Sequence, residues 1–89
     1  MLKNGSRGER VEILQKRLVK LGFDVATDGI FGSGTEAVVK ELQALFNYTV
    51  DGIVGEGTDR LIDAQIGYGW NRTAPDAKER AAKANPPKK

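Results

Sequence analysis

The sequence contains no cysteine and no histidine. The first absence excludes a disulfide framework and a thiolate nucleophile. The second removes the commonest general base and the commonest zinc ligand. We therefore expect no metal and no cofactor in this chain. No apolar run is long enough to cross a membrane, and no secretory signal follows Met1.

The 89 residues allow one small domain, with a core near the lower limit for independent folding. Residues 1–69 carry 8 Lys/Arg against 10 Asp/Glu, whereas residues 70–89 carry 6 against 2. Residues 73–85 contain no apolar side chain larger than alanine and so offer no face to bury. We expect a globular domain at 1–69 and, at 70–89, a basic linker or marginal exposed helix leading to an absent domain. Pro75 is the expected first helical residue there, and Asn85-Pro86-Pro87 the expected stop.

One octet occurs twice, as DGIFGSGT at residues 28–35 and DGIVGEGT at residues 51–58, with six of eight positions identical. Each Asp-Gly pair predicts a turn in which Gly29 or Gly52 takes a left-handed conformation. Asp28 and Asp51 are expected to accept hydrogen bonds from the turn amides. Each Gly-x-Gly-Thr segment predicts a helix start. The repeat therefore indicates two equivalent corners in one fold.

Apolar residues at helical spacing predict three helices. The first follows a capping box from Ser6 to Glu9 and ends at Gly22, after which Phe23 folds back on the last turn. Its apolar stripe consists of Val11, Leu14, Leu18 and Leu21, widened by Ile13 and Val19.

The second helix starts at residues 33–36, with Gly32 as the alternative cap. It ends at Asn47, because asparagine accepts a positive φ more readily than most residues. Its apolar stripe consists of Val38, Leu42, Leu45 and Phe46, with Val39 beside it.

The third helix starts at residues 56–58, runs to about Ile66 and ends at Gly67 and Gly69. It buries Leu61 together with Ile62 or Ile66. The predicted fold class is all-α: a compact three-helix bundle with two repeated Asp-Gly-Ile-x-Gly corner loops. At most a brief β pairing is expected, between residues 30–31 and 53–54.

These motifs closely resemble a known family. Val11-x-x-Leu14-Gln15, Leu21-Gly22-Phe23 and the two octets occur in the order and spacing of the three-helix peptidoglycan-binding domain of bacterial cell-wall hydrolases, spore-cortex lytic enzymes and phage endolysins. The resemblance covers roughly residues 2–66. Leu42 stands where the family usually has phenylalanine, Asn47-Tyr48 replaces Gly-Leu, and Asp59 replaces a frequent aromatic residue.

The resemblance implies a non-catalytic module that binds the glycan strands and stem peptides of peptidoglycan. It also implies a covalently linked lytic domain, and we expect a monomer from the N-terminal part of a phage endolysin. Such a protein is made in the host bacterial cytoplasm without a signal peptide and acts at the cell wall. We expect no membrane insertion. The alternative is a protein-interaction module or pro-domain of the same fold without a glycan ligand.

Two further functions are weaker. Specific nucleic-acid binding through residues 70–89 is disfavoured, because proline and alanine dilute the basic residues there. Catalysis is disfavoured because glycoside cleavage needs paired carboxylates, one of them in an apolar cleft. The four glutamates of the first two helices all fall at solvated or capping positions: Glu9, Glu12, Glu36 and Glu41.

The helix starts at the corners are the candidate binding surface, because free amides and the positive end of the helix dipole favour carboxylates of the stem peptides. Several candidates also have a structural interpretation: Phe31 as a core residue, and Thr35 and Thr58 as caps of their own helices. Trp70 either seals the core or lies free in the linker. Gln15 and Gln43 either hydrogen-bond the corner loops, which we favour, or line a groove. The predicted ligand-binding residues are Asp28, Gly29, Phe31, Gly32, Thr35, Tyr48, Asp51, Gly52, Gly55 and Thr58.

Overall fold

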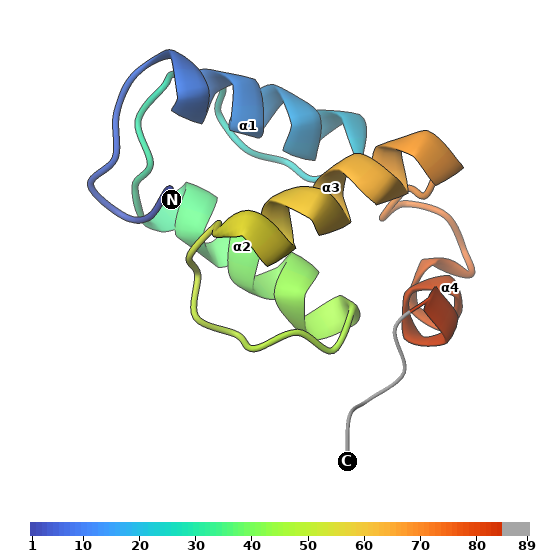
Figure 1. Cartoon of the computed structure of the whole chain (residues 1–89). Helices are drawn as coiled ribbons and strands as arrows, with labels where there is room; N and C mark the ends of the chain where they lie inside the picture. Colours follow the sequence, from blue (N-terminus) through green and yellow to red (C-terminus); the bar gives the residue numbers. More distant parts are fainter. Residues whose placement is uncertain (85–89) are drawn as a thin grey trace.

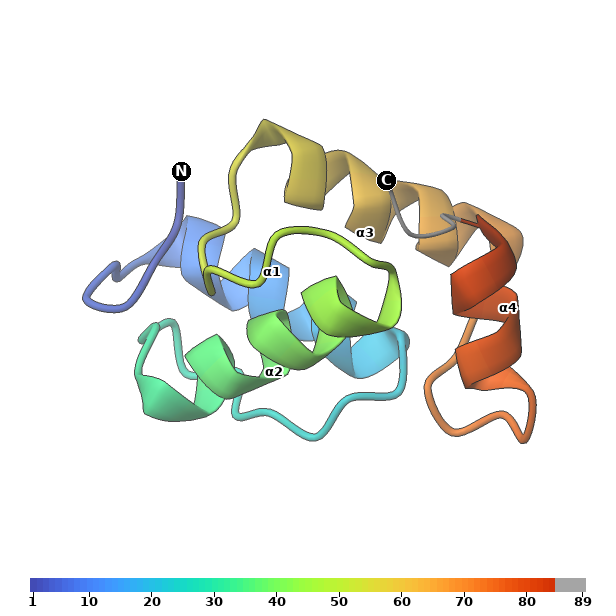
Figure 2. The ribbon, with the colours of Figure 1, turned by 90° about the horizontal axis from the view of Figure 1, so that it is seen from below.

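The computed structural model describes residues 1–84, and these residues are all-helical apart from turns and two isolated β-bridges. The helices are α1 (Glu9–Lys20), α2 (Ser33–Leu45), α3 (Glu56–Tyr68) and α4 (Ala77–Ala84). Figures 1 and 2 show that α1, α2 and α3 all begin at the end of the molecule that holds the N-terminus. α4 packs at the opposite end, near the last turn of α3. No helix within residues 1–84 is both long and apolar enough to span a membrane.

The core is built from one stripe of each long helix. In α1 the predicted stripe is confirmed, since Val11, Leu14, Leu18 and Leu21 are buried. The prediction that Ile13 and Val19 widen the stripe is wrong, because their side chains are 51% and 46% exposed. The flank of the stripe is occupied instead by Gln15, which is completely buried.

In α2 and α3 the predicted stripes need small corrections. Val39 is fully buried beside Leu42 and Phe46, whereas Val38 and Leu45 are only partly buried. α3 buries Leu61 and Ile62, with Ile66 packed partly against them. It also continues through Gly67 to Tyr68, so Gly67 does not end it; Gly69, at φ 76°, does.

The helix starts use glycine instead of side-chain caps. The predicted capping box is wrong, because the N-cap of α1 is Gly8 and no side-chain hydrogen bond caps the helix. The Ser6 hydroxyl accepts a hydrogen bond from the backbone N–H of Lys3 (3.1 Å) instead. Gly32 and Gly55 are the N-caps of α2 and α3. At the other ends, Gly22 (φ 95°) and Asn47 (φ 59°) have the predicted positive φ.

The N-terminal segment, residues 1–8, pairs with both repeated octets. The predicted pairing of residues 30–31 with 53–54 is wrong; the two β-bridges join Arg7 to Ile30 and Leu2 to Val54. Leu2 and Val54 exchange both backbone hydrogen bonds, at 3.0 and 2.7 Å. Each octet therefore pairs with residues that precede α1, which holds the N-terminal segment against both.

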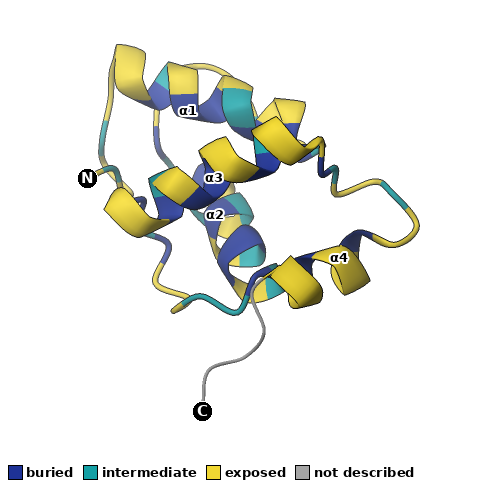
Figure 3. Cartoon of the chain, turned by 45° about the vertical axis from the view of Figure 1, so that its right-hand side comes forward, coloured by how far each residue is buried: buried dark blue, intermediate teal, exposed yellow. Residues whose placement is uncertain are grey.

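α4 is packed, contrary to the expectation that residues 73–85 have no face to bury. Ala81 is completely buried and Ala77 is 5% exposed, so the inner face of α4 is covered (Figure 3). Trp70 seals this contact: its Nε1–H donates to the backbone oxygen of Ala77 (3.0 Å), and its ring centre lies 5.0 Å from that of Phe46. Because alanine is small, the backbone of α4 can approach the indole closely. α4 begins at Ala77, not at Pro75, and the predicted stop at Asn85-Pro86-Pro87 lies outside the described residues.

Candidate functional site

Corner 1, residues 28–35, is organised by the buried side chain of Gln15. Its Nε2 group donates to Asp28 Oδ1 (3.2 Å), to the backbone oxygen of Ile30 (3.0 Å) and to Thr35 Oγ1 (3.1 Å). Its Oε1 atom accepts the backbone N–H of Gly29 (2.8 Å). One side chain of α1 thus joins the turn to the first turn of α2.

Corner 2, residues 51–58, repeats this arrangement around Gln43 of α2. Nε2 donates to Asp51 Oδ1 (2.9 Å), the Ile53 oxygen (3.1 Å) and Thr58 Oγ1 (3.2 Å). Oε1 accepts two backbone amides, those of Asp51 (3.1 Å) and Gly52 (3.0 Å). The prediction that both glutamines hydrogen-bond the corner loops is confirmed.

The Asp-Gly turns have the predicted geometry. Gly29 and Gly52 have φ values of 74° and 71°. The backbone N–H of Ile30 donates to Asp28 (3.0 Å), and that of Ile53 donates to Asp51 (2.9 Å). These amide donors, and then the glutamine side chains, lower the pKa of both aspartates below the ordinary value. Both carboxylates are exposed and therefore charged at neutral pH.

Burial divides the predicted ligand-binding residues into two groups. Phe31 is 1% exposed, which confirms the core interpretation and leaves no ring face for a sugar. The two threonines accept hydrogen bonds from the glutamines, and neither caps its own helix, so the capping prediction was wrong. The buried group is Gly29, Phe31, Thr35, Gly52 and Thr58; the accessible group is Asp28, Gly32, Tyr48, Asp51 and Gly55.

A surface hollow lies at each corner. That of corner 1 has a volume of about 390 Å³ and is lined by residues 24–26, Asp28, Ile30 and the start of α2. That of corner 2, about 270 Å³, includes Tyr48, Asp51 and the start of α3. Each hollow is lined both by an exposed aspartate and by first-turn residues of a helix, whose amides have no intrahelical acceptor. Within residues 1–84 no group of three or more Asp, Glu, His or Cys side chains could hold a metal ion.

A hollow of about 380 Å³ between α1 and α3 offers less to a ligand. Arg17 lines it, but its guanidinium already pairs with Asp59 (2.8 Å) and Asp63 (2.6 Å). These contacts tie α1 to α3.

Comparison with known sequence families identifies the family of this chain. A family model described as "Putative peptidoglycan binding domain" matches residues 7–61, which include both corners and both glutamines. The chain belongs to this family. A search of the curated proteins finds no match.

Solved structures of related proteins agree with this assignment of a peptidoglycan-binding domain. The N-terminal domain of SleB is 35% identical, with a TM-score of 0.70 over 73% of this chain and 90% of that one. A Burkholderia AP3 phage endolysin is 34% identical, with a TM-score of 0.69 over 92% of this chain and 31% of that one. A fused Zn-dependent amidase/peptidase/peptidoglycan-binding domain-containing protein from Clostridium acetobutylicum is 32% identical (TM-score 0.69), over 86% of this chain and 31% of that one. The chain thus spans about a third of the latter two proteins.

One further hollow of this peptidoglycan-binding domain is not predicted by the sequence patterns. It has a volume of about 540 Å³ and is lined by Phe46, Tyr48, Arg60, Leu61, Ala64, Gln65, Tyr68 and Ala84. Three of the five α3 residues that line this hollow follow residue 61, where the family match ends: Ala64, Gln65 and Tyr68. The available signal was the spacing of Gln65 and Tyr68, which stand three residues apart and so share one side of α3.

Proposed function

We propose that this domain is a non-catalytic wall-binding module that holds an attached lytic enzyme on peptidoglycan, as the N-terminal part of a phage endolysin. Family membership indicates peptidoglycan as the partner and the cell wall as the place of action. The match of residues 7–61, covering both corners, is the observation that carries the proposal. The similarity to an endolysin and to a fused amidase, each about three times the length of the matched part, supports a linked catalytic domain.

Attachment of a catalytic domain to this wall-binding module would raise the effective concentration of its substrate. A tethered catalytic domain that stays near the wall meets its substrate at the local concentration set by the linker, without any new catalytic contact. We propose that residues 70–89 include the connection to that domain. Only Ala77 and Ala81 of α4 are buried. The exposed, basic outer face of this helix is therefore compatible with a connecting segment.

At each corner we propose that the first amides of α2 and α3 contact the ligand. Nothing lies within 4 Å of the position of a Cβ atom at Gly32 or Gly34, so the backbone there is open to a partner. The nearby charged Asp28 and Asp51 repel carboxylates, which makes peptide carbonyl oxygens of the stems better partners for these amides than the carboxylates expected from the sequence. The aspartates can accept N–H or O–H groups of the same ligand.

Binding of the chain to purified sacculi tests the proposal, with Gly34→Val as the site variant. Valine at this position meets open space and no positive φ, so the fold should persist while its side chain covers the α2 amides. We expect roughly tenfold weaker binding, the loss of one or two hydrogen bonds. Ala44→Val, at the exposed far end of the same helix, is the matched control and should bind as the original chain does.

The alternative, an interaction module without a glycan ligand, makes the opposite prediction. In that case the chain stays in the supernatant with sacculi of every stem-peptide type. Equal binding by Gly34→Val and Ala44→Val would remove the corners from the binding surface while leaving the wall-binding function in place.

A further inference from the structure

Gln65 of α3 holds the position that Gln43 holds in α2. Counted from the left-handed residue that closes each helix, Asn47 or Gly69, both glutamines stand four residues earlier. The backbone oxygen of Gln43 accepts the N–H of Tyr48 (2.8 Å), and that of Gln65 accepts the N–H of Trp70 (3.1 Å). Both the Nε2 and the Oε1 atom of Gln43 hydrogen-bond to corner 2. The sequence contains no third Asp-Gly corner after α3.

The side-chain amide of Gln65 has no hydrogen-bond partner among residues 1–84, although the residue is only 5% exposed. No fully buried side-chain nitrogen or oxygen in this part of the chain lacks a partner. The Gln65 amide therefore touches solvent, and the 540 Å³ hollow that it lines is where it does so. An unpaired amide that is mostly buried is costly unless something else satisfies it.

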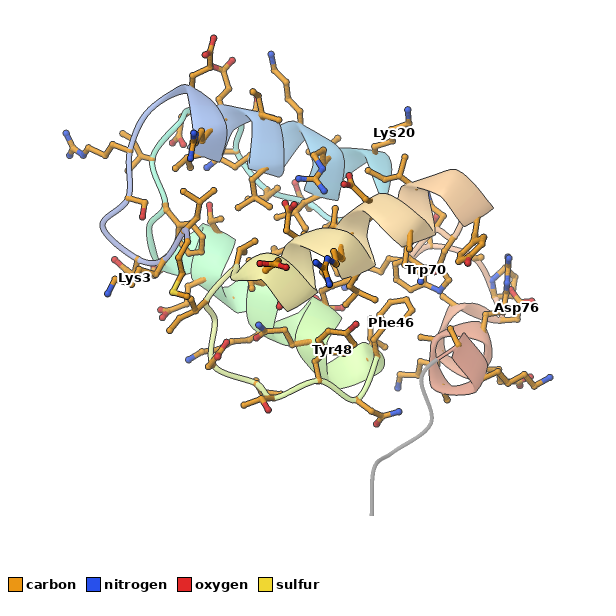
Figure 4. The ribbon with its side chains drawn as sticks, viewed as in Figure 1. Lys3, Lys20, Phe46, Tyr48, Trp70 and Asp76 are labelled. Carbon is orange, nitrogen blue, oxygen red and sulfur yellow. The ribbon has the colours of Figure 1, made fainter. Side chains whose placement is uncertain are left out.

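The rest of the hollow is aromatic with a polar rim. Tyr48 is half-buried and Tyr68 is 74% exposed, and both line it over an apolar base of Phe46 and Leu61. Figure 4 shows Tyr48 and Phe46 together between the end of α2 and α3. Arg60 adds a cationic group whose side chain is 76% exposed and pairs with Glu56. The volume lies within the range of small-ligand sites.

This combination suits an N-acetylated sugar. Tyrosine presents a flat apolar face with a hydroxyl at its edge, which matches the C–H face and the hydroxyls of a pyranose. A glutamine amide has both donor and acceptor groups, so it can donate to an acetamido carbonyl and accept from the acetamido N–H. Resting on the proposed function, we propose that the Gln65 hollow is a subsite for the N-acetylated amino sugars of the glycan strand, separate from the corners.

The full chain should be titrated with N-acetylglucosamine tetramer, following NMR shifts of the Gln65 side-chain amide and of the Tyr68 backbone. The glucose tetramer, which lacks the acetamido group, is the matched probe. We expect shifts with the first sugar only. Gln65→Leu should weaken its binding at least about fivefold without lowering stability, because no hydrogen bond within residues 1–84 is lost. Tyr68→Ala, a change at an exposed ring, should weaken it similarly, and Ala44→Val should leave it unchanged.

Absence of shifts with the N-acetylated tetramer, or equal shifts with both sugars, would overturn the subsite. Sacculus binding separates this result from the proposed function. Wall binding that persists in the original chain without any response at Gln65 removes the subsite alone. A response at Gln65 without wall binding keeps the subsite and removes the proposed function.

Discussion

The two corners share one internal network but differ in what surrounds them. At corner 1 a Cβ atom on Gly29 would lie 3.2 Å from the backbone oxygen of Gly8, which accepts the backbone N–H groups of Val11 and Glu12 at the start of α1. At corner 2 a Cβ atom on Gly52 would meet the flexible side chains of Glu36 (2.9 Å) and Lys40 (3.1 Å). The glutamine contacts are nevertheless almost the same. The glutamine therefore defines the corner, and the surroundings determine how much change the corner tolerates.

The largest effect should come from removing the glutamines. Gln15→Leu leaves the buried Gly29 amide and Thr35 hydroxyl without this partner, at about 1–3 kcal/mol for each such group. We expect a loss of roughly 3 kcal/mol in the free energy of unfolding. Gln43→Leu should cost at least as much, because Gln43 accepts two backbone amides where Gln15 accepts one. Urea denaturation followed by the fluorescence of Trp70 measures both.

Gln65→Leu is the control for this pair, since it replaces a mostly buried helical glutamine without breaking a side-chain hydrogen bond within residues 1–84. Its unfolding free energy should be unchanged or higher. If all three variants lost the same stability, side-chain packing would explain the effect, and the networks at the corners would not.

A smaller effect should separate the corners from each other. Gly29→Ala and Gly52→Ala both place a side chain at positive φ, which costs about 1–2 kcal/mol. Gly29→Ala should be the costlier, at roughly 2 kcal/mol against 1, because the Gly8 carbonyl belongs to the backbone, whereas the side chains of Glu36 and Lys40 can rotate away. Thermal unfolding measures the difference.

Gly34→Ala is the matched control for the glycine pair, since it lies in open space without positive φ and should be neutral or slightly stabilising. Equal losses at Gly29 and Gly52 would show that the surroundings of the corners do not matter.

Local patterns in the sequence predicted much of this structure. Helical spacing identified the α1 stripe, and the Asp-Gly pairs identified both turns, because each depends on residues close together in the chain. The roles of Gln15 and Gln43 were also predictable, since each lies beside an apolar stripe and needs a partner when buried.

Long-range contacts were not predictable in the same way. Nothing in residues 1–8 indicates that Leu2 pairs with Val54, because an isolated bridge leaves no periodic pattern. The burial of Ala77 and Ala81 depends on the Trp70 indole reaching a backbone oxygen of α4, and an alanine-rich helix has the same composition whether packed or exposed. Thr35 and Thr58 were expected to cap helices because threonine is common there, but the glutamines provide the stronger constraint.

The smallest predicted effect concerns pH. The folded-state pKa of Asp28 and of Asp51 is lowered, so each aspartate stabilises the fold above its unfolded-state pKa of about 4 and loses this contribution as the pH falls through its folded-state pKa. Asp28→Asn and Asp51→Asn keep an oxygen for the Ile30 or Ile53 amide but remove the titration. Each variant should therefore lose less thermal stability than the original chain between pH 6 and pH 2.5, and the two effects should add because the corners share no partner. Asp24→Asn, next to corner 1 but outside its hydrogen bonds, is the control. An unchanged pH profile in the double variant would show that the ionised carboxylates of Asp28 and Asp51 do not contribute to the stability of the fold.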